Sequence, residues 1–320
     1  MSTTTPPAPV VVTGGAGAIG AILTRTLADA GHPVRVIDNL SSGRRDRLTD
    51  LESSGKIQFQ EYDLRKPAGL TKIFRGASTV WHLAANANVQ KGTEDPRLDL
   101  EHGTLATAHV LEAARRTDLH RILFSSSSVV YGLPTIFPTP ESYGPLLPES
   151  QYGAAKLAAE GLISAYCHSY GMEGWIFRFA NVVGPGMDHG VIYDFLRKLQ
   201  RDPTRLEVLG DGNQAKSYLW VDDCIAGMRL AEERSHDRVN VFNLGTEQQV
   251  PVREIAARVV HALGDRARIE YTGGTQGWVG DIPRQLLSVE RIRALGWKPR
   301  FDSSAVVDKA IATCRAELGL

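Results

Sequence analysis

The chain has 320 residues, and its 36 lysine and arginine residues balance 36 aspartate and glutamate residues. This length can bury a large core, and zero net charge argues against a general binder of nucleic acid or of a membrane surface, although a local basic cleft stays open. No apolar run reaches the roughly 18 residues of a membrane-spanning helix, and the first residues lack the apolar core of a signal peptide. We therefore expect a cytoplasmic protein without nucleic-acid or membrane partners.

Cysteine and histidine give no sign of metal chemistry. The three cysteines (Cys167, Cys224 and Cys314) form no CxxC pair, and the nine histidines show no metal-ligand spacing. We expect reduced thiols and no metal site.

Short apolar runs alternate with helical patterns in the first half of the chain, which is typical of βαβ units and a parallel sheet. The expected strands are 10–13, 34–37, 57–61, 79–83, 121–125 and 175–179, and the expected helices are 19–30, 70–74, 99–117 and 152–170. After Asn181, segments 239–244 and 252–263 are expected to return to the sheet. The region from Arg268 is expected to be loop-rich before a last helix at 303–318.

A glycine-rich stretch follows the first strand. Gly14, Gly17 and Gly20 are spaced three apart and open a helical pattern. Such glycines allow a tight turn and close approach of a pyrophosphate to a helix N-terminus, although a left-handed turn alone also explains a glycine run. Asp38 lies eighteen residues beyond Gly20 at the end of the second strand. A carboxylate there accepts hydrogen bonds from ribose hydroxyls and repels a 2′-phosphate, so it favours NAD over NADP.

A second feature is Tyr152 and Lys156, four residues apart on an expected helix. This spacing places both side chains on one face, although it also fits an ordinary exposed pair. Charged Lys156 would hold the nicotinamide ribose and lower the pKa of Tyr152, making the phenol a base. The serine run 125–128 follows an apolar strand, and one of its hydroxyls would bind the oxygen that Tyr152 deprotonates.

Taken together, these motifs make the chain similar to a known family. In chain order they are 13–20, 38–43, 63–64, 82–85, 125–132, 152–156, 178–185 and 210–212. They resemble the extended short-chain dehydrogenase/reductase family, and within it the nucleotide-sugar epimerases of the UDP-glucose 4-epimerase type. The resemblance spans essentially the whole chain.

The resemblance implies a fold and a domain division. The fold is α/β, a Rossmann-type doubly wound parallel sheet with a smaller C-terminal substrate-binding lobe. The NAD-binding domain would be residues 1–180, with the chain returning to it at about 221–267. The nucleotide-sugar-binding lobe would be 181–220 and 268–320.

The resemblance also implies site residues. The catalytic group would be Ser127, Tyr152 and Lys156. The NAD-binding residues would be Gly14, Gly17, Ala18, Ile19, Asp38, Asn39, Ser42, Gly43, Asp63, Leu64, Leu83, Ala84, Ala85, Tyr152 and Lys156. The substrate-binding residues would be Ser127, Tyr152, Asn181, Val191, Lys216, Asp281 and Arg284.

Some departures from the family pattern concern the reaction. Ser128 and Val129 stand where related 4,6-dehydratases carry an Asp-Glu pair and decarboxylases carry the Glu, so both reactions are disfavoured. The segment Asp99-Leu100 replaces an asparagine that supports the cofactor site.

Other departures concern phosphate binding. Lys216 replaces an arginine, which keeps the charge but loses the bidentate fork. Trp278 replaces a second arginine, and either Arg284 or Trp278 itself is left to compensate.

We therefore predict an isomerase that epimerises C4 of a nucleotide-diphosphate hexose of the UDP-glucose/UDP-galactose type, through a transient 4-keto sugar and with NAD bound throughout. A UDP-uronic acid or UDP-N-acetylhexosamine substrate stays open, as does a related NAD-dependent dehydratase, reductase or dehydrogenase. A non-catalytic NAD-sensing protein would not need Ser127, Tyr152 and Lys156 together. The helices expected at 99–117 and 152–170 resemble the family's four-helix dimer interface, so we expect a homodimer.

Overall fold

The computed structural model describes residues 7–86, 89–278 and 280–320. The chain forms two compact units. Unit 1 comprises Met1–Ser126, Ala155–Phe177 and Ser235–Val241, and unit 2 comprises Ser127–Ala154, Arg178–Arg234 and Phe242–Leu320. The predicted boundary between an NAD-binding and a sugar-binding lobe concerns ligands and stays a prediction.

The strands are β1 (Val10–Thr13), β2 (Val34–Asp38), β3 (Ile57–Glu61), β4 (Thr79–His82), β5 (Arg121–Ser127), β6 (Glu173–Phe179), β7 (Asn181–Val183), β8 (Arg205–Val208), β9 (Ala215–Lys216), β10 (Tyr218–Trp220), β11 (Val239–Leu244), β12 (Val250–Pro251), β13 (Arg268–Tyr271) and β14 (Arg284–Gln285). The helices are α1 (Ala18–Asp29), α2 (Thr49–Ser53), α3 (Leu70–Phe74), α4 (Val89–Glu94), α5 (Pro96–Asp99), α6 (Ala106–Arg116), α7 (Gln151–Tyr170), α8 (Val191–Arg201), α9 (Val221–Arg234), α10 (Val252–Ala262), α11 (Glu290–Ala294) and α12 (Ser303–Leu318).

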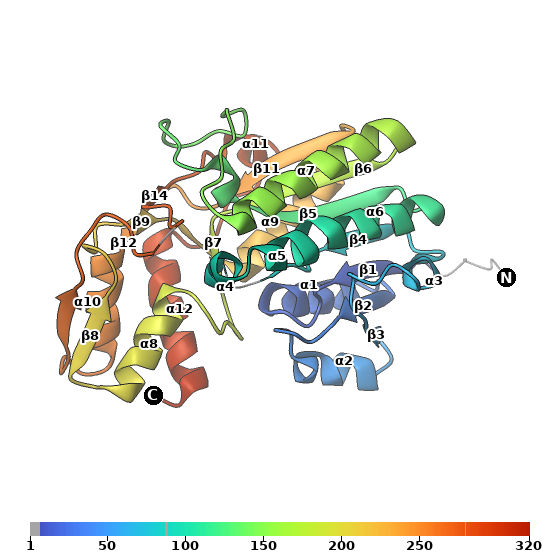
Figure 1. Cartoon of the computed structure of the whole chain (residues 1–320). Helices are drawn as coiled ribbons and strands as arrows, with labels where there is room; N and C mark the ends of the chain where they lie inside the picture. The colour runs from blue at the N-terminus through green and yellow to red at the C-terminus, as the bar shows by residue number, and fades with distance from the viewer. Residues whose placement is uncertain (1–6, 87–88, 279) are drawn as a thin grey trace. The chain divides into compact units, whose positions relative to one another are not determined.

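A seven-stranded sheet has the order β11-β6-β5-β4-β1-β2-β3 (Figure 1). The pairs β3–β2, β2–β1, β1–β4 and β4–β5 are parallel. All four residues of β1 and of β4 are buried, as expected for strands covered on both faces. The predicted Rossmann-type sheet is confirmed. The strand order reverses between β1 and β4, and ligands of such sheets bind at the carboxyl ends beside this reversal.

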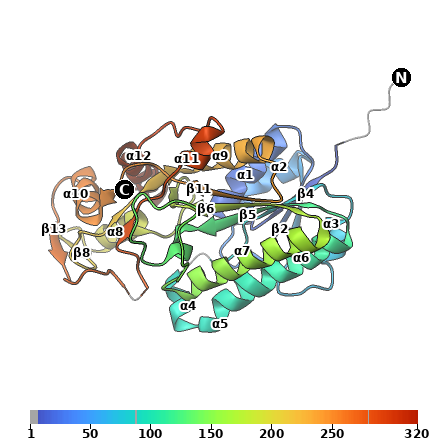
Figure 2. The same ribbon diagram turned by 90° about the horizontal axis from the view of Figure 1, so that it is seen from above.

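One face of the sheet in unit 1 is covered by α3, α6 and α7. Strand residues Val11, Val80 and Ile122 share one buried cluster with Leu111 of α6 and Ile163 of α7. Figure 2 shows α6 and α7 side by side on this face and α1 on the other. Within the described part of the chain, no helix is long and apolar enough to cross a membrane.

Two predicted elements differ from the structure. The helix expected at 99–117 has three parts, because a π-helical turn, Leu100–Leu105, joins α5 to α6. The prediction that 252–263 returns to the sheet is wrong, since this segment forms α10 in unit 2. Its buried residues, Ile255 and Val259 among them, recur at helical spacing, and the β-branched residues obscured that period.

Two helical glycines give a matched test of the fold. A Cβ on Gly20 of α1 would lie 2.0 Å from the carbonyl oxygen of Gly14, a backbone atom that cannot yield without moving the loop. We expect Gly20→Ala to lower the thermal midpoint by several degrees, because overpacking against backbone is destabilising. Gly161→Ala in α7 is the control. Its Cβ would meet nothing within 4 Å, so alanine should stabilise this helix by up to about 1 kcal/mol. A Gly20→Ala protein as stable as wild type would refute the packing described here.

Candidate functional site

The glycine loop of unit 1 has the geometry that a pyrophosphate requires. Gly14 has a φ of +68°, and a Cβ there would lie 2.7 Å from the amide nitrogen of Ala84. Gly17 is the N-cap of α1 and supplies no side-chain cap, and the first turn of α1 carries no acidic residue. The first N–H groups of α1 (Ala18 and Ile19 among them) therefore have no side-chain acceptor at their helix end, which suits a bound phosphate.

The carboxylate of Asp38 is buried at the end of β2. Its oxygens accept hydrogen bonds from the backbone N–H groups of Ala16 and Leu40, both at 2.9 Å. A carboxylate has about four acceptor positions, so two are left for ribose hydroxyls. A Cβ on Gly43 would lie 2.7 Å from this carboxylate, so a side chain at this position would displace it.

Other predicted NAD-binding residues lie in the loops after β2, β3 and β4. Asn39 and Ser42 belong to the turn after β2, where the Asn39 side chain accepts a hydrogen bond from the Ser41 backbone. Asp63 is paired with Arg65 at 2.7 Å, and this guanidinium holds the pKa of Asp63 down to about 2. Leu64 is buried. The half-buried residues after β4 are Leu83, Ala84 and Ala85.

Two arginines close to Asp38 are engaged with acidic neighbours. Arg44 lies 2.5 Å from Asp46, and Arg45 lies 2.6 Å from Glu52. These pairs agree with the choice of NAD, because an enzyme selective for NADP places an arginine at the 2′-phosphate.

Lys156 of α7 is a buried cation. Its Nζ donates a hydrogen bond to the carbonyl oxygen of Ser125 at 2.5 Å and lies 4.6 Å from the centre of the Phe124 ring. Burial lowers the pKa of Lys156 to about 7, and the carboxylates of Glu160 and Asp99 oppose this shift. Burial therefore makes the charged form of Lys156 unfavourable in free energy. Strongly shifted pKa values of this kind are common at functional sites.

The two carboxylates were not predicted as site residues. Glu160 lies one turn after Lys156 on α7 and accepts a hydrogen bond from the Ser126 hydroxyl at 2.5 Å. Asp99 is 1% exposed, and burial raises its pKa. One Asp99 oxygen accepts from Asn86 at 3.0 Å, and the other has no hydrogen-bond partner among the described residues. The i, i+4 spacing from Lys156 was the available signal for Glu160, whereas Asp99 was noticed only as a departure from the family pattern.

In unit 2, Ser127 begins the turn that follows β5. Its Oγ accepts a hydrogen bond from the backbone N–H of Val129 at 3.4 Å, which caps the short 3-10 turn Ser128–Tyr131. Tyr131 anchors this turn, because its hydroxyl donates to Asn243 at 2.7 Å and accepts from Arg178 at 3.0 Å.

The same unit brings the start of α7 to this turn. A Cβ on Gly153 would lie 3.1 Å from the carbonyl oxygen of Val129 and 2.8 Å from the Pro148 side chain. Tyr152, the residue before Gly153, is half-buried in the first turn of α7. Helical geometry places Lys156 on the same face of α7, one turn further on.

A polar cluster in unit 2 holds several predicted substrate-binding residues. Gln285 donates to the Ser128 hydroxyl at 2.6 Å and accepts from the Asn181 amide at 3.4 Å. Lys216 forms an ion pair of 2.5 Å with Asp281, which is 4% exposed. Lys216 is the strand partner of Gln285 between β9 and β14, so both side chains leave the same face. Gln285 was missed, because a glutamine in a two-residue strand gives no sequence signal.

The remaining residues considered for substrate binding also belong to unit 2. Arg284 precedes Gln285, and its guanidinium lies 4.4 Å from the Phe137 ring centre. Val191 is the first residue of α8 and is half-buried. Trp278 is half-buried near Gly280. The choice between Arg284 and Trp278 as the replacement for the absent arginine stays open.

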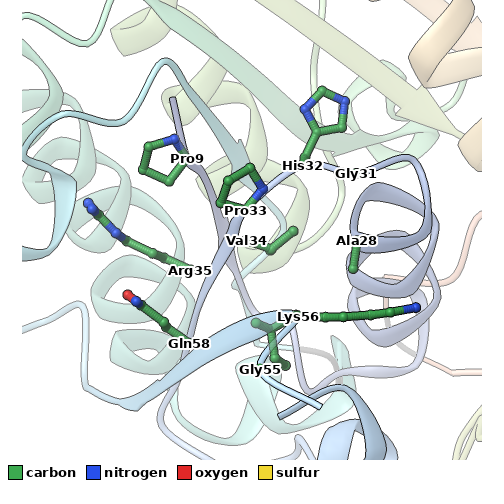
Figure 3. Close-up of a pocket in the computed structure, with 11 residues that line it drawn as sticks. Pro9, Ala28, Gly31, His32, Pro33, Val34, Arg35, Gly55, Lys56 and Gln58 are labelled. Carbon is green, nitrogen blue, oxygen red and sulfur yellow. The ribbon is translucent and has the colours of Figure 1, made fainter. Parts of the chain in front are cut away.

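A cavity of about 410 Å³ lies at the opposite, amino-terminal ends of β2 and β3 (Figure 3). Its Arg35 side chain donates to two backbone carbonyls at 2.8 Å, and its Lys56 pairs with Asp29 at 2.9 Å. Since open α/β sheets bind ligands at the carboxyl ends of their strands, we assign no function to this cavity.

The chain is similar to known proteins along nearly its whole length. A model of the NAD dependent epimerase/dehydratase family matches residues 10–245. A putative UDP-glucose 4-epimerase of Methanocaldococcus jannaschii is 31% identical over 308 residues, 94% of this chain and 97% of that protein. A UDP-galactose 4-epimerase crystal structure matches with a TM-score of 0.87 at 38% identity, covering 97% of this chain and 99% of that one. A Thermus thermophilus UDP-glucose 4-epimerase complex with NAD gives a TM-score of 0.84 at 30% identity, covering 96% and 99%.

The chain therefore belongs to the NAD dependent epimerase/dehydratase family. The predicted resemblance to the nucleotide-sugar epimerases among the extended short-chain dehydrogenases/reductases is confirmed. NAD is confirmed as the cofactor, because the family is NAD dependent. The glycine loop and Asp38 fit this cofactor.

The buried Lys156 predicts how stability changes with pH. The unfolded chain keeps a lysine pKa of about 10.4, whereas the folded pKa is about 7. The unfolded state therefore binds more protons between these values, and stability rises with pH across that window. We expect the thermal midpoint of wild type, relative to that of Lys156→Met, to rise between about pH 7 and 9.

Lys72→Met is the matched control, because Lys72 is an exposed lysine of α3. Its midpoint difference from wild type should stay constant over the same range. A constant or falling difference for Lys156→Met would contradict the lowered pKa of Lys156 in the folded protein.

Proposed function

We propose that this protein epimerises C4 of a UDP-hexose of the UDP-glucose/UDP-galactose type with bound NAD. The observation that carries the proposal is the pair on α7, where a buried Lys156 lies one helical turn from Tyr152. Relatives named as UDP-glucose 4-epimerases support it.

Tyr152 is the proposed base. The positive field of Lys156 lowers the pKa of Tyr152, so that the phenolate takes the proton of the C4 hydroxyl. The hydroxyl of Ser127 donates a hydrogen bond to the same sugar oxygen. NAD supplies the hydride acceptor and donor at C4. The 4-keto sugar turns between the two transfers, and Tyr152 returns the proton to the C4 oxygen of the epimer.

The residues after Ser127 favour epimerisation over elimination or decarboxylation. Val129 has no proton to move, and the Ser128 hydroxyl accepts a hydrogen bond from Gln285 at 2.6 Å. A dehydratase needs an acid and a base at these positions. Neither side chain supplies one, so the keto sugar keeps all its substituents.

The substrate is proposed to bind through its nucleotide diphosphate. Asn181 and Lys216, with Arg284, would hold the phosphates, or Trp278 would instead stack on the base. Val191 would contact the substrate from the start of α8. The ion pair with Asp281 offsets the positive charge of Lys216. A second cation, Arg284, would therefore matter for the affinity for the diphosphate. A firmly held diphosphate leaves the hexose free to turn.

The test is a panel of nucleotide sugars given to the purified protein without added NAD. We expect C4 epimers of one UDP-hexose, with no net oxidation and no loss of water. Tyr152→Phe should lower kcat by at least about a hundredfold while bound NAD is retained, since a general base contributes about 10²–10⁴-fold.

Tyr170→Phe is the matched control on the same helix, since Tyr170 is 49% exposed. It should keep wild-type activity. Epimerisation retained by Tyr152→Phe would reject the assigned base, and a dehydrated or oxidised product would move the protein to a dehydratase or dehydrogenase.

We also propose a homodimer through α6 and α7. Exposed apolar side chains near these helices support it: Leu100 is 58% exposed and Leu105 is 43% exposed. We expect sedimentation at micromolar concentration to give a dimer, and Leu105→Lys to shift it toward monomer because a buried charge is costly. A wild-type monomer under these conditions would contradict the proposal.

A further inference from the structure

The imidazole of His82, at the end of β4, is fully buried between two threonines. Its Nδ1 lies 2.7 Å from the Thr13 hydroxyl, and its Nε2 lies 3.0 Å from the Thr107 hydroxyl. Thr13 ends β1, and Thr107 lies in α6. The ring therefore connects a strand of the sheet to a helix on its face.

The hydrogen-bond partners fix where the protons lie. The Thr107 hydroxyl donates its single proton to the carbonyl oxygen of Gly103 at 2.6 Å. It can then only accept from His82, so Nε2 carries a proton. The Thr13 hydroxyl accepts from the backbone N–H of Ala84 at 3.3 Å, and its own proton goes to Nδ1 of His82. Every donor in this chain of hydrogen bonds has one acceptor.

The two ends of this chain of hydrogen bonds lead to different parts of the site. At one end, Ala84 belongs to the loop beside Gly14, where the pyrophosphate is expected. At the other end, Gly103 lies in the π-helical turn and packs on α7. A Cβ on Gly103 would lie 2.9 Å from the Cβ of Ala155, the residue before Lys156. π-helical turns are frequent at functional sites.

The electrostatics also require a neutral ring. The Phe124 ring lies close to both groups, with its centre 5.6 Å from the His82 ring centre and 4.6 Å from Nζ of Lys156. An imidazolium at His82 would repel the Lys156 ammonium. Burial and the charge of Lys156 lower the pKa of His82 to about 3, so the ring stays neutral.

We propose that His82 is a positioning residue, fixed as the neutral Nε2–H tautomer, which couples the loop of Ala84 to the helix that carries Lys156. The inference rests on the proposed function only for the role of Lys156. The tautomer and the retention of NAD are measured without sugar, so failure here and failure of the epimerase assignment are distinguishable.

The first test is 15N NMR of the histidine-labelled holoenzyme, with the His82 signals assigned by their loss in His82→Gln. We expect a pyridine-like Nδ1 and a pyrrole-like Nε2 that do not titrate between about pH 5.5 and 8.5, the range in which an ordinary histidine changes charge. An Nδ1–H tautomer, or a ring that titrates in this range, would overturn the proposal. This measurement needs no variant of either threonine.

The second test compares three threonine variants of the holoenzyme. Thr107→Val removes the acceptor of His82, so we expect the tautomer to leave pure Nε2–H and NAD to dissociate about tenfold faster, the scale of one unsatisfied buried group. Thr107→Ser restores the hydroxyl and should restore both the Nε2–H tautomer and the wild-type rate of NAD dissociation. Thr24→Val is the matched control, because Thr24 is also fully buried and its hydroxyl has no hydrogen-bond partner among the described residues.

Thr24→Val should keep the wild-type tautomer and NAD release within about twofold. If Thr107→Val behaves like Thr24→Val in either reading, His82 does not couple the two segments.

Discussion

The ammonium of Lys156, kept inside the protein, is the constraint on which the rest of the site depends. A pKa lowered from 10.5 to about 7 corresponds to roughly 5 kcal/mol against the charged form. The fold offsets this cost with the Ser125 carbonyl, the face of Phe124 and two carboxylates nearby. A neutral His82 prevents further repulsion. The end of β5, the π-helical turn and α7 are thus arranged around one charge.

Much of the fold could be predicted from the sequence, because short buried strands and helical spacing are local signals. The ranges of β1, β3, α3 and α12 agree with the expected ones, and β2, β4 and β5 differ only at their ends. The π-helical turn at Leu100–Leu105 was not predicted. Its Gly103 packs closely against Ala155 of α7, a contact between distant segments that no local pattern marks. The prediction that 252–263 returns to the sheet missed the helix α10, whose buried residues recur at helical spacing.

The residues of the candidate site were likewise predictable only where the sequence signal is local. Residues with a fixed spacing, such as Gly14, Asp38 and the pair Tyr152 and Lys156, were found from the sequence. Contacts between distant segments were not: Gln285 reaches Ser128 across 157 positions of the chain, and no local pattern marks it. The ion pair of Lys216 with Asp281 joins two residues that were predicted separately as substrate-binding. Roles that depend on a ligand stay predictions.

In the proposed reaction, the C4 hydrogen of the sugar leaves and returns as a hydride without exchanging with water. The most direct measurement uses UDP-hexose that carries deuterium at C4, turned over by the protein in ordinary water. We expect the epimeric product to keep its deuterium at C4. Deuterium lost from C4 to water would contradict it, because the carbon would then have been deprotonated instead of oxidised.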